Sequence, residues 1–278
     1  MKIAVVPNLT KEAAQACTDE VLKILKACGC ETVLKTDLFT AHGVYRERVE
    51  DSLHSCDLFI AIGGDGTIIH TAKLAASLDK PILGVNAGTL GFTAGVERHE
   101  LSLLANLVRG EYREERRLML SVELLSGGES RSFYALNDAV LSGEPAKIID
   151  YQMVLGGRCY RYRADGFIVA TPTGSTAYSL SAGGPVIEPN MDCLVYTPIC
   201  PHSLFNRSII FGAQSRLMVD IPENLGKLYL SVDGETPLEV FPGDQLCFAP
   251  ANRSARFLRL GSRDFYDILN QKIIETRQ

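Results

Sequence analysis

One short stretch of the sequence combines several glycines with a single carboxylate. Gly63, Gly64 and Gly66 surround Asp65, and Thr67 follows directly. Glycines in a turn let backbone N–H groups approach a phosphate closely, and the N-terminus of a helix carries a partial positive charge that favours anions. A lone acid in such a turn indicates a proton acceptor or a metal ligand. The alternative is a tight strand-to-helix turn in which Asp65 only caps the helix.

This glycine turn differs from both common nucleotide-binding turns. A P-loop has Lys and then Ser or Thr after its last glycine, whereas Gly66 is followed by Thr67 and Ile68. A dinucleotide fingerprint needs a third Gly or Ala after two intervening residues, and that position is Ile69. The turn therefore belongs to neither class.

Two further polar stretches are candidates for ligand contacts. The loop from Asn86 to Phe92 contains two glycines and can bring backbone amides and the Asn86 side chain to a ligand beside Asp65. Asn137 and Asp138 interrupt a strand pattern, where short polar side chains are poor strand formers and need partners unless they are exposed. The ribose of a ligand would supply those partners. An ordinary loop and a strand edge or bulge are the alternatives.

A second carboxylate and a hydroxyl-rich run follow later in the chain. Asp165 precedes Gly166 and could accept hydrogen bonds from a ribose or a carboxamide, although an Asp-Gly turn explains it equally well. The run from Thr171 to Pro185 is rich in Ser, Thr and Gly, so it could wrap a flat heteroaromatic ring. The alternative is a flexible linker, against which Tyr178 and Leu180 argue. Two lone histidines, His70 near the glycine turn and His202, are weaker candidates.

The residues around the glycine turn predict a parallel, three-layered α/β domain, because strand patterns alternate with helical ones. Ligands on such sheets bind at the carboxyl ends of strands, where both Asp65 and Asn86 fall. Thr10 is the predicted N-cap of the first helix. The predicted strands cover Lys2–Val6, Thr32–Leu34, Leu58–Ile62 and Pro81–Asn86, and the predicted helices cover Thr10–Ala27 and 68–78.

The pattern changes after residue 100, where a helix over Leu101–Val108 gives way to short alternating segments separated by turn residues. This pattern predicts an all-β, sandwich-like domain over 101–254. A final helix over Asp264–Ile274 is expected to pack back on the first domain, which comprises 1–100 and about 255–278. The predicted strands are Arg117–Leu125, Ser132–Leu141, Ile149–Leu155, Phe167–Ala170, Arg216–Ile221, Lys227–Val232 and Gln245–Ala249.

The composition argues against several classes of protein. The 278 residues carry a net charge of −5 with Lys and Arg scattered, which disfavours a nucleic-acid partner. The sequence shows no apolar run near the ~20 residues of a membrane span and no cleavable signal. Eight dispersed cysteines without a Cys-x-x-Cys pair predict free thiols. We therefore expect a cytoplasmic protein without a nucleic-acid or membrane partner.

Taken together, these motifs resemble the NAD kinase family of the bacterial ATP-NAD kinase type, over roughly residues 1 to 260. The glycine turn alone is shared with diacylglycerol and sphingosine kinases. The Asn86–Phe92 loop, the Asn137-Asp138 pair, the Asp165-Gly166 turn and the Thr171–Pro185 run, in that order, are more specific to NAD kinases. The resemblance implies phosphorylation of the 2′-hydroxyl of the adenosine ribose of NAD by ATP, giving NADP and ADP. It also implies Mg²⁺ or another divalent cation and a homodimer or homotetramer.

The resemblance also implies a role for individual residues. Asp65 matches the catalytic aspartate, Asn137 and Asp138 match a ribose-binding pair, and Asp165 matches the carboxylate on the nicotinamide side. Thr176 to Ser181 match the run that lines the adenine and its ribose. No metal-ligating residue is predicted. The predicted ligand-binding residues are Gly63, Gly64, Gly66, Thr67, His70, Asn86, Phe92, Asn137, Asp138, Arg163, Asp165, Thr176, Ala177, Tyr178 and Ser181.

The sequence departs from the family pattern at two positions. Thr89 replaces a residue that is frequently His, and Glu235 stands where Gln is common. Two alternative functions are a lipid or sugar kinase that shares the glycine turn and a non-catalytic NAD sensor. The run Thr171–Ser181 argues against the first alternative, and the intact Asp65 argues against the second.

Overall fold

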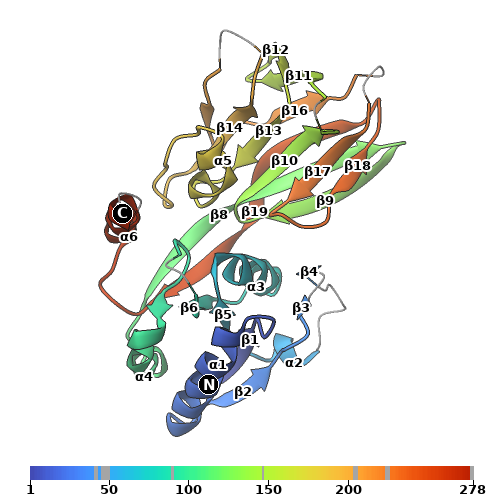
Figure 1. The fold of residues 1–278 in the computed structure, drawn as a ribbon. Helices are drawn as coiled ribbons and strands as arrows, with labels where there is room; N and C mark the ends of the chain where they lie inside the picture. Colours follow the sequence, from blue (N-terminus) through green and yellow to red (C-terminus); the bar gives the residue numbers. More distant parts are fainter. Residues whose placement is uncertain are drawn as a thin grey trace. The chain divides into compact units, whose positions relative to one another are not determined.

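A computed structural model of the chain describes residues 1–40, 43–44, 51–88, 91–145, 147–202, 206–222 and 226–275. The chain forms two compact units, Met1–Arg117 with Ala255–Gln278 and Leu118–Ser254 (Figure 1). The first unit thus continues past the predicted boundary near residue 100. The predicted fold class, a parallel α/β part, a β-sandwich-like part and a C-terminal helix, is confirmed.

The first unit is built on a parallel sheet in the order β6-β5-β1-β2 (Figure 1). Every residue of β5 is buried, as expected for a strand covered on both faces. Each predicted strand is present, with its ends shifted by at most one residue. The strands are β1 (Lys2–Pro7), β2 (Glu31–Leu34), β5 (Leu58–Gly63) and β6 (Ile82–Asn86).

Helices complete the first unit. The apolar face of α1 (Glu12–Ala27) buries Cys17, Val21 and Leu25 in the same core as strands β1 and β5. The predicted N-cap Thr10 is wrong, because α1 begins after Lys11 and the Thr10 hydroxyl donates to Asn8 Oδ1 at 2.5 Å. The remaining elements are β3 (Phe39–Thr40), β4 (Gly43–Val44), α2 (Asp51–His54), α3 (Asp65–Ser77), β7 (Val96–Glu97), η1 (Arg98–Leu103), α4 (Leu104–Val108) and α6 (Phe265–Glu275).

The second unit contains a six-stranded antiparallel sheet in the order β15-β14-β13-β10-β17-β18 and further antiparallel strands facing it across one core. Aromatic side chains fill that core, among them Tyr151, Phe167, Tyr196 and Phe248. The strands are β8 (Arg113–Ser126), β9 (Glu129–Ala135), β10 (Asp138–Gly143), β11 (Ile149–Leu155), β12 (Arg158–Ala164), β13 (Gly166–Ala170), β14 (Cys193–Ile199), β15 (Ile209–Gly212), β16 (Leu217–Asp220), β17 (Leu228–Val232), β18 (Leu238–Val240) and β19 (Gln245–Arg259), of which β8 and β19 extend into the first unit.

The predicted single strand Ser132–Leu141 is wrong. The chain leaves β9 after Ala135 and re-enters a strand at Asp138, because the Asp233 carboxylate accepts the backbone N–H groups of Leu136, Asn137 and Asp138. These hydrogen bonds replace the ladder bonds that a continuous strand would make.

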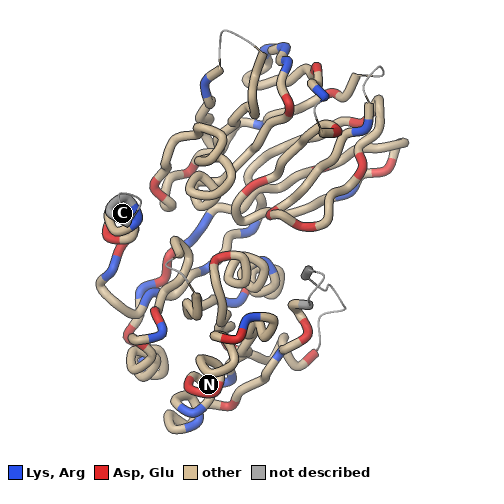
Figure 2. The backbone as a smooth tube through the Cα atoms, in the orientation of Figure 1, with Lys and Arg blue, Asp and Glu red and all other residues tan. Residues whose placement is uncertain are grey.

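The distribution of charged residues and the state of the cysteines agree with what the sequence predicted. Figure 2 shows basic and acidic residues interspersed along the backbone of both units. All eight cysteines, each within the described ranges, are free. In the part of the chain that the structure describes, every helix is too short or too polar to span a bilayer.

Candidate functional site

The glycine turn joins β5 directly to α3. Gly64 is the N-cap in an extended conformation, and Asp65 is the first helical residue. A Cβ on Gly63 would collide with the side chain of Thr67, which is buried and accepts a hydrogen bond from Asn8 Nδ2 at 3.2 Å. A Cβ on Gly66 would meet no atom within 4 Å. Gly63 thus permits the close packing of the turn, whereas the backbone at Gly66 is open to an approaching ligand.

Both carboxylate oxygens of Asp65 are held by the loop that follows β6. The backbone N–H of Phe92 donates to Oδ2 at 3.0 Å, and the backbone N–H of Thr93 donates to Oδ1 at 3.1 Å. The Thr93 hydroxyl also donates to Oδ1. Because a carboxylate oxygen has two lone-pair sites, Oδ1 is fully occupied by its two donors, whereas Oδ2 has one donor and retains room for one more. Asp65 is therefore fixed in orientation and still able to accept a hydrogen bond from a substrate hydroxyl.

Gly91 is a functional residue that the sequence reasoning missed. A Cβ at this position would overlap the carboxylate of Asp65. The loop can pass Asp65 closely enough to donate two N–H groups only because Gly91 has no side chain. The signal was the glycine immediately before Phe92, which the sequence analysis treated only as a source of loop backbone amides.

A lysine also lies near the glycine turn, although the turn itself contains none. The Nζ atom of Lys11, in the loop between β1 and α1, would be 3.6 Å from a Cβ on Gly64. Lys11 is exposed, so its ammonium group is accessible to an anion beside the turn. No local motif marks this lysine, because the contact depends on the pairing of β1 with β5.

Three other predicted residues of the first unit shape the loops around Asp65. The buried Asn86 donates from Nδ2 to Glu97 Oε2 at 2.8 Å and accepts the Gly88 N–H at 2.9 Å. The ring of Phe92 packs on Phe265 of α6, with centroids 6.0 Å apart. His70 is half-buried on α3, and its ring centroid is 6.4 Å from that of Phe39. Thr89 lies outside the described residues.

In the second unit, Asn137 and Asp138 are presented at the start of β10 by the Asp233 carboxylate, which accepts their backbone N–H groups at 2.8 and 3.1 Å. The Asp138 side chain is buried. The Asn137 Oδ1 atom is also buried, and it has no hydrogen-bond partner among the described residues. Since a buried polar atom without a partner costs about 1–3 kcal/mol, Asn137 Oδ1 indicates a place for a ligand donor.

The hydroxyl-rich run is an ordered segment, with a 3-10 turn at Gly174–Thr176 and a short helix, α5, at Tyr178–Ser181. Ser175 and Ser179 are buried and bond within the protein, to Pro172 O at 2.7 Å and Thr197 Oγ1 at 3.0 Å. The four predicted ligand contacts of the run are half-buried or exposed, and the hydroxyl of one of them, Thr176, donates to Thr173 O at 3.2 Å. These contacts are Thr176, Ala177, Tyr178 and Ser181.

The structure brings this run next to the Asn137-Asp138 pair. A Cβ on Gly174 would overlap the backbone carbonyl of Asn137, and the Thr171 N–H donates to the same carbonyl at 2.8 Å. Asp165 and Arg163 lie at the end of β12 and are exposed, and Arg163 Nε is 3.9 Å from Asp150 Oδ1.

His202 and Glu235, to which the sequence assigned no definite role, make backbone hydrogen bonds in the structure. The His202 N–H donates to Arg163 O at 2.7 Å. The Glu235 carbonyl accepts the Ser231 hydroxyl at 3.0 Å, and its N–H donates to Val232 O at 3.0 Å. Among the described residues, His, Cys, Asp and Glu side chains form no group of three or more that could hold a metal ion.

Comparison with known proteins places this geometry in a family. The family model for the ATP-NAD kinase N-terminal domain matches residues 3–112, and the family model for the ATP-NAD kinase C-terminal domain matches residues 136–260. An NAD kinase of Symbiobacterium thermophilum is 40% identical, over 99% of this chain and 99% of its own length. An NAD kinase of Geotalea daltonii is 36% identical, over 98% of each chain.

Two solved structures have the same fold. Yeast NADH kinase complexed with NADH superposes with a TM-score of 0.85 at 24% identity, covering 98% of this chain and 87% of that one. An NAD kinase from Archaeoglobus fulgidus in complex with ATP gives a TM-score of 0.77 at 26% identity, with 98% of both chains covered. The chain therefore belongs to the ATP-NAD kinase family, and the predicted enzyme class, an ATP-dependent NAD kinase, is confirmed.

Proposed function

We propose that this enzyme transfers the γ-phosphoryl group of ATP to the 2′-hydroxyl of the adenosine ribose of NAD, giving NADP and ADP. The observation that carries the proposal is the setting of Asp65. Its carboxylate stands at the first residue of α3, beside a glycine turn, with both oxygens oriented by the loop after β6. A fixed carboxylate next to a phosphate-binding turn suits proton removal from a hydroxyl that attacks phosphorus.

In this proposal Asp65 accepts the proton of the 2′-hydroxyl and aims its oxygen at the γ-phosphorus. A ribose hydroxyl is a weak nucleophile, so a positioned general base can contribute about 10²–10⁴-fold to the rate. Oδ2 of Asp65 can accept this further hydrogen bond without giving up the one from the Phe92 N–H, while Thr93 continues to hold Oδ1. Little of the barrier then depends on moving protein groups during the reaction.

The triphosphate would be held by the backbone N–H groups of Gly64 and Gly66, the N-terminal end of α3 and the ammonium group of Lys11. Mg²⁺ bound to ATP would neutralise part of the phosphate charge. Mg²⁺ commonly binds proteins through one or two carboxylates plus substrate phosphates, so ATP would carry the ion into the site.

The second unit would bind the nucleoside parts of NAD. Asn137 Oδ1 is a buried acceptor that a ribose hydroxyl could satisfy, and Asp138 lies beside it. Thr176, Ala177, Tyr178 and Ser181 would line the adenine and its ribose. Asp165 would bind on the nicotinamide side. The predicted homodimer or homotetramer remains a prediction that sedimentation would test.

The experiment is a coupled assay of NADP formation from NAD and Mg-ATP by the wild type and Asp65→Asn. The variant should bind NAD nearly as the wild type does, by calorimetry, and lose most of its kcat. Glu12→Gln is the matched control, because Glu12 is also an acid in the first turn of a helix, α1, but lies outside the glycine turn. Near-wild-type kcat in Asp65→Asn would contradict the assignment. Phosphorylation of diacylglycerol instead of NAD would favour the lipid-kinase alternative.

A further inference from the structure

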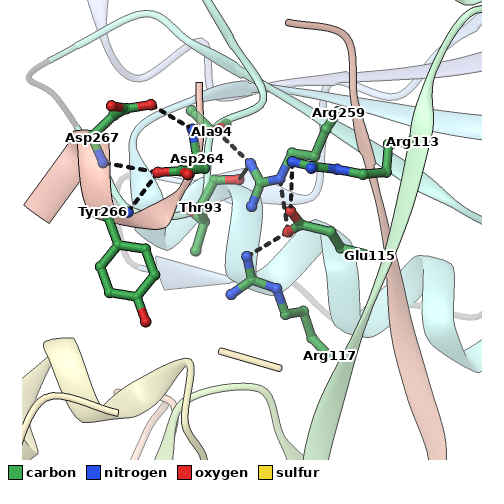
Figure 3. A network of polar contacts seen from close by, with 9 residues as sticks. All are labelled: Thr93, Ala94, Arg113, Glu115, Arg117, Arg259, Asp264, Tyr266 and Asp267. Atoms are coloured by element: carbon green, nitrogen blue, oxygen red, sulfur yellow. Dashed lines mark hydrogen bonds and ion pairs between the residues drawn. The ribbon is translucent and has the colours of Figure 1, made fainter. Parts of the chain in front are cut away.

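A buried arginine near the end of β19 holds the same loop that holds Asp65. One terminal nitrogen of Arg259 donates to the carbonyl oxygens of Thr93 at 3.2 Å and Ala94 at 2.6 Å (Figure 3). Its Nε donates to Glu115 of β8 at 3.0 Å. Only 8% of Arg259 is exposed. A buried guanidinium therefore joins two backbone carbonyls of the loop to a strand of the first unit.

Several contacts hold the Arg259 guanidinium in place. Glu115 also accepts a hydrogen bond from Arg117 at 2.8 Å and one from Arg113 at 3.4 Å. The guanidinium carbons of Arg117 and Arg259 each lie 5.8 Å from the ring centroid of the buried Phe257. Planar guanidinium groups in such a charge-assisted network have little rotational freedom. Arg259 is thus a rigid support for the loop.

Thr93 connects this support to the carboxylate. Its carbonyl accepts from Arg259, while its N–H and hydroxyl donate to Asp65 Oδ1. The loop also borders a cleft of about 520 Å³ that is lined by Ala94, Arg259 and other residues of the first unit. Where the loop borders this cleft, the hydrogen bonds from Arg259 hold the carbonyls of Thr93 and Ala94 in place.

We propose that Arg259 is a positioning residue that sets the orientation of Asp65 through the carbonyls of Thr93 and Ala94. The inference rests on the proposed role of Asp65 as the catalytic base. Arg259 itself touches no reacting atom. Without it, the loop would move toward the cleft and carry the donors of Asp65 with it. A displacement of about 1 Å in a catalytic group can lower the rate by about 100-fold.

The test compares Arg259→Gln with Arg256→Gln. Arg256 lies on the same strand and makes a similar pair with β8, to Glu114 at 2.9 and 2.8 Å, but its other hydrogen bond goes to Asp79 O, outside the loop. Arg259→Gln should lower kcat by about 100-fold with KM for NAD and ATP close to wild type, and Arg256→Gln should leave kcat close to wild type. Hydrogen exchange of the Phe92 and Thr93 amides should accelerate in Arg259→Gln only. Unchanged exchange or unchanged kcat in that variant would overturn the proposal.

Two further variants separate positioning from general stability. Arg259→Lys keeps the charge but lacks the fork that reaches both carbonyls and Glu115, so it should fold and recover part of kcat. If Arg259→Gln does not fold, an Arg259→Lys protein with wild-type kcat and wild-type exchange of both amides would overturn the proposal. In the Asp65→Asn background, Arg259→Gln should lower the residual turnover no further, and a full additional loss would overturn the proposal. An active Asp65→Asn enzyme would instead show that the base assignment has failed, and the positioning proposal with it.

Discussion

The carboxylate of Asp65 lies against the backbone of Gly91, so a residue without a side chain is required where the loop passes the acid. We predict that Gly91→Ala lowers kcat by about 100-fold, because a Cβ would overlap the carboxylate and push the loop or Asp65 out of place. The variant should still fold, since the strain is local. NADP formation and circular dichroism would measure the two effects.

Gly88→Ala is the control for this prediction. Gly88 belongs to the same loop, and the nearest atom to a Cβ there is Asn86 Oδ1 at 3.9 Å, an ordinary contact. Its kcat should remain close to that of the wild type. Equal losses in the two variants would show that the loop tolerates no added side chain at either glycine, and that Gly91 has no special relation to Asp65.

Asp65 and the glycines around it could be selected as site candidates from the sequence, because their residue types and spacing are enough to suggest a phosphate-binding turn with a carboxylate. Gly91 and Lys11 could not, since each matters through a contact with a turn that lies far away along the chain. Asn137 could be predicted only in part. The sequence shows that it fits poorly in a strand, but the cause is a hydrogen bond from its backbone N–H to the Asp233 carboxylate, which depends on tertiary structure.

At the scale of elements, Glu115 joins β8 to β19 by accepting hydrogen bonds from arginines on both strands. Burial raises the pKa of the Glu115 carboxyl, but the positive charges and hydrogen bonds of Arg259 and Arg117 outweigh it, and the pKa lies below its ordinary 4.5. Burial, and then the charge of Arg259, lower the pKa of Arg117 to about 10. The ionised Glu115 carboxylate thus accepts hydrogen bonds from three arginines, Arg113, Arg117 and Arg259.

We predict that Glu115→Gln lowers the free energy of unfolding at pH 7 by about 3 kcal/mol, because it leaves buried arginine charge without its counter-ion. A carboxyl group whose pKa is lower in the folded chain than in the unfolded chain stabilises the folded state, and this stabilisation is complete at pH values above the ordinary pKa. The stabilisation is lost as the pH falls from about 4.5 through the pKa of Glu115 in the folded chain. The difference between the wild type and Glu115→Gln should therefore narrow below about pH 4.5 in urea titrations.

Glu114→Gln provides the comparison, since Glu114 pairs with Arg256 between the same strands in a more exposed position. Glu114→Gln should lower the free energy of unfolding by at most about 1 kcal/mol. A Glu115→Gln protein as stable as Glu114→Gln at pH 7, or a difference from the wild type that does not depend on pH, would contradict the prediction.

The elements themselves were predicted unevenly, for a physical reason. Three strands of the parallel sheet, β1, β5 and β6, are almost entirely buried and read as continuous apolar runs, so their ends could be placed within one residue. β12, β14, β15 and β18 were not predicted. Strand β12 (Arg158–Ala164) is mostly exposed and rich in arginine, and β14 contains Pro198, so neither has a typical strand pattern. Pairing with neighbouring strands, which the sequence does not display, makes these segments strands.

At the scale of the whole molecule, the proposed function gives the two compact units different roles. In that proposal the first unit would supply Asp65, the glycine turn and the arginines around Glu115, and the second would supply Asn137 and the accessible part of the 171–185 run. The overall class was predictable because one half of the chain alternates strands with helices and the other does not. We therefore expect ligand affinity and apo stability to respond separately to changes in the second unit.

Asn137→Ala tests this separation. Among the described residues, the buried Oδ1 atom has no partner in the apo protein, so its removal should leave the free energy of unfolding unchanged or slightly higher. NAD at 100 times its Kd stabilises the wild type by about 2.7 kcal/mol. A variant that binds about tenfold more weakly would lose about 1.3 kcal/mol of this at the same NAD concentration. Thermal unfolding with and without NAD would measure both quantities.

Asn252→Ala distinguishes a ligand contact from a general effect of truncation. Asn252 is an exposed asparagine of β19 in the same unit, and its variant should show the wild-type response to NAD. If Asn137→Ala lowered apo stability while keeping the full NAD-dependent shift, Asn137 would be a structural residue and its buried oxygen would have a partner within the protein. If apo stability held and the shift shrank, the unsatisfied oxygen would be a cost that the apo enzyme carries for binding its substrate.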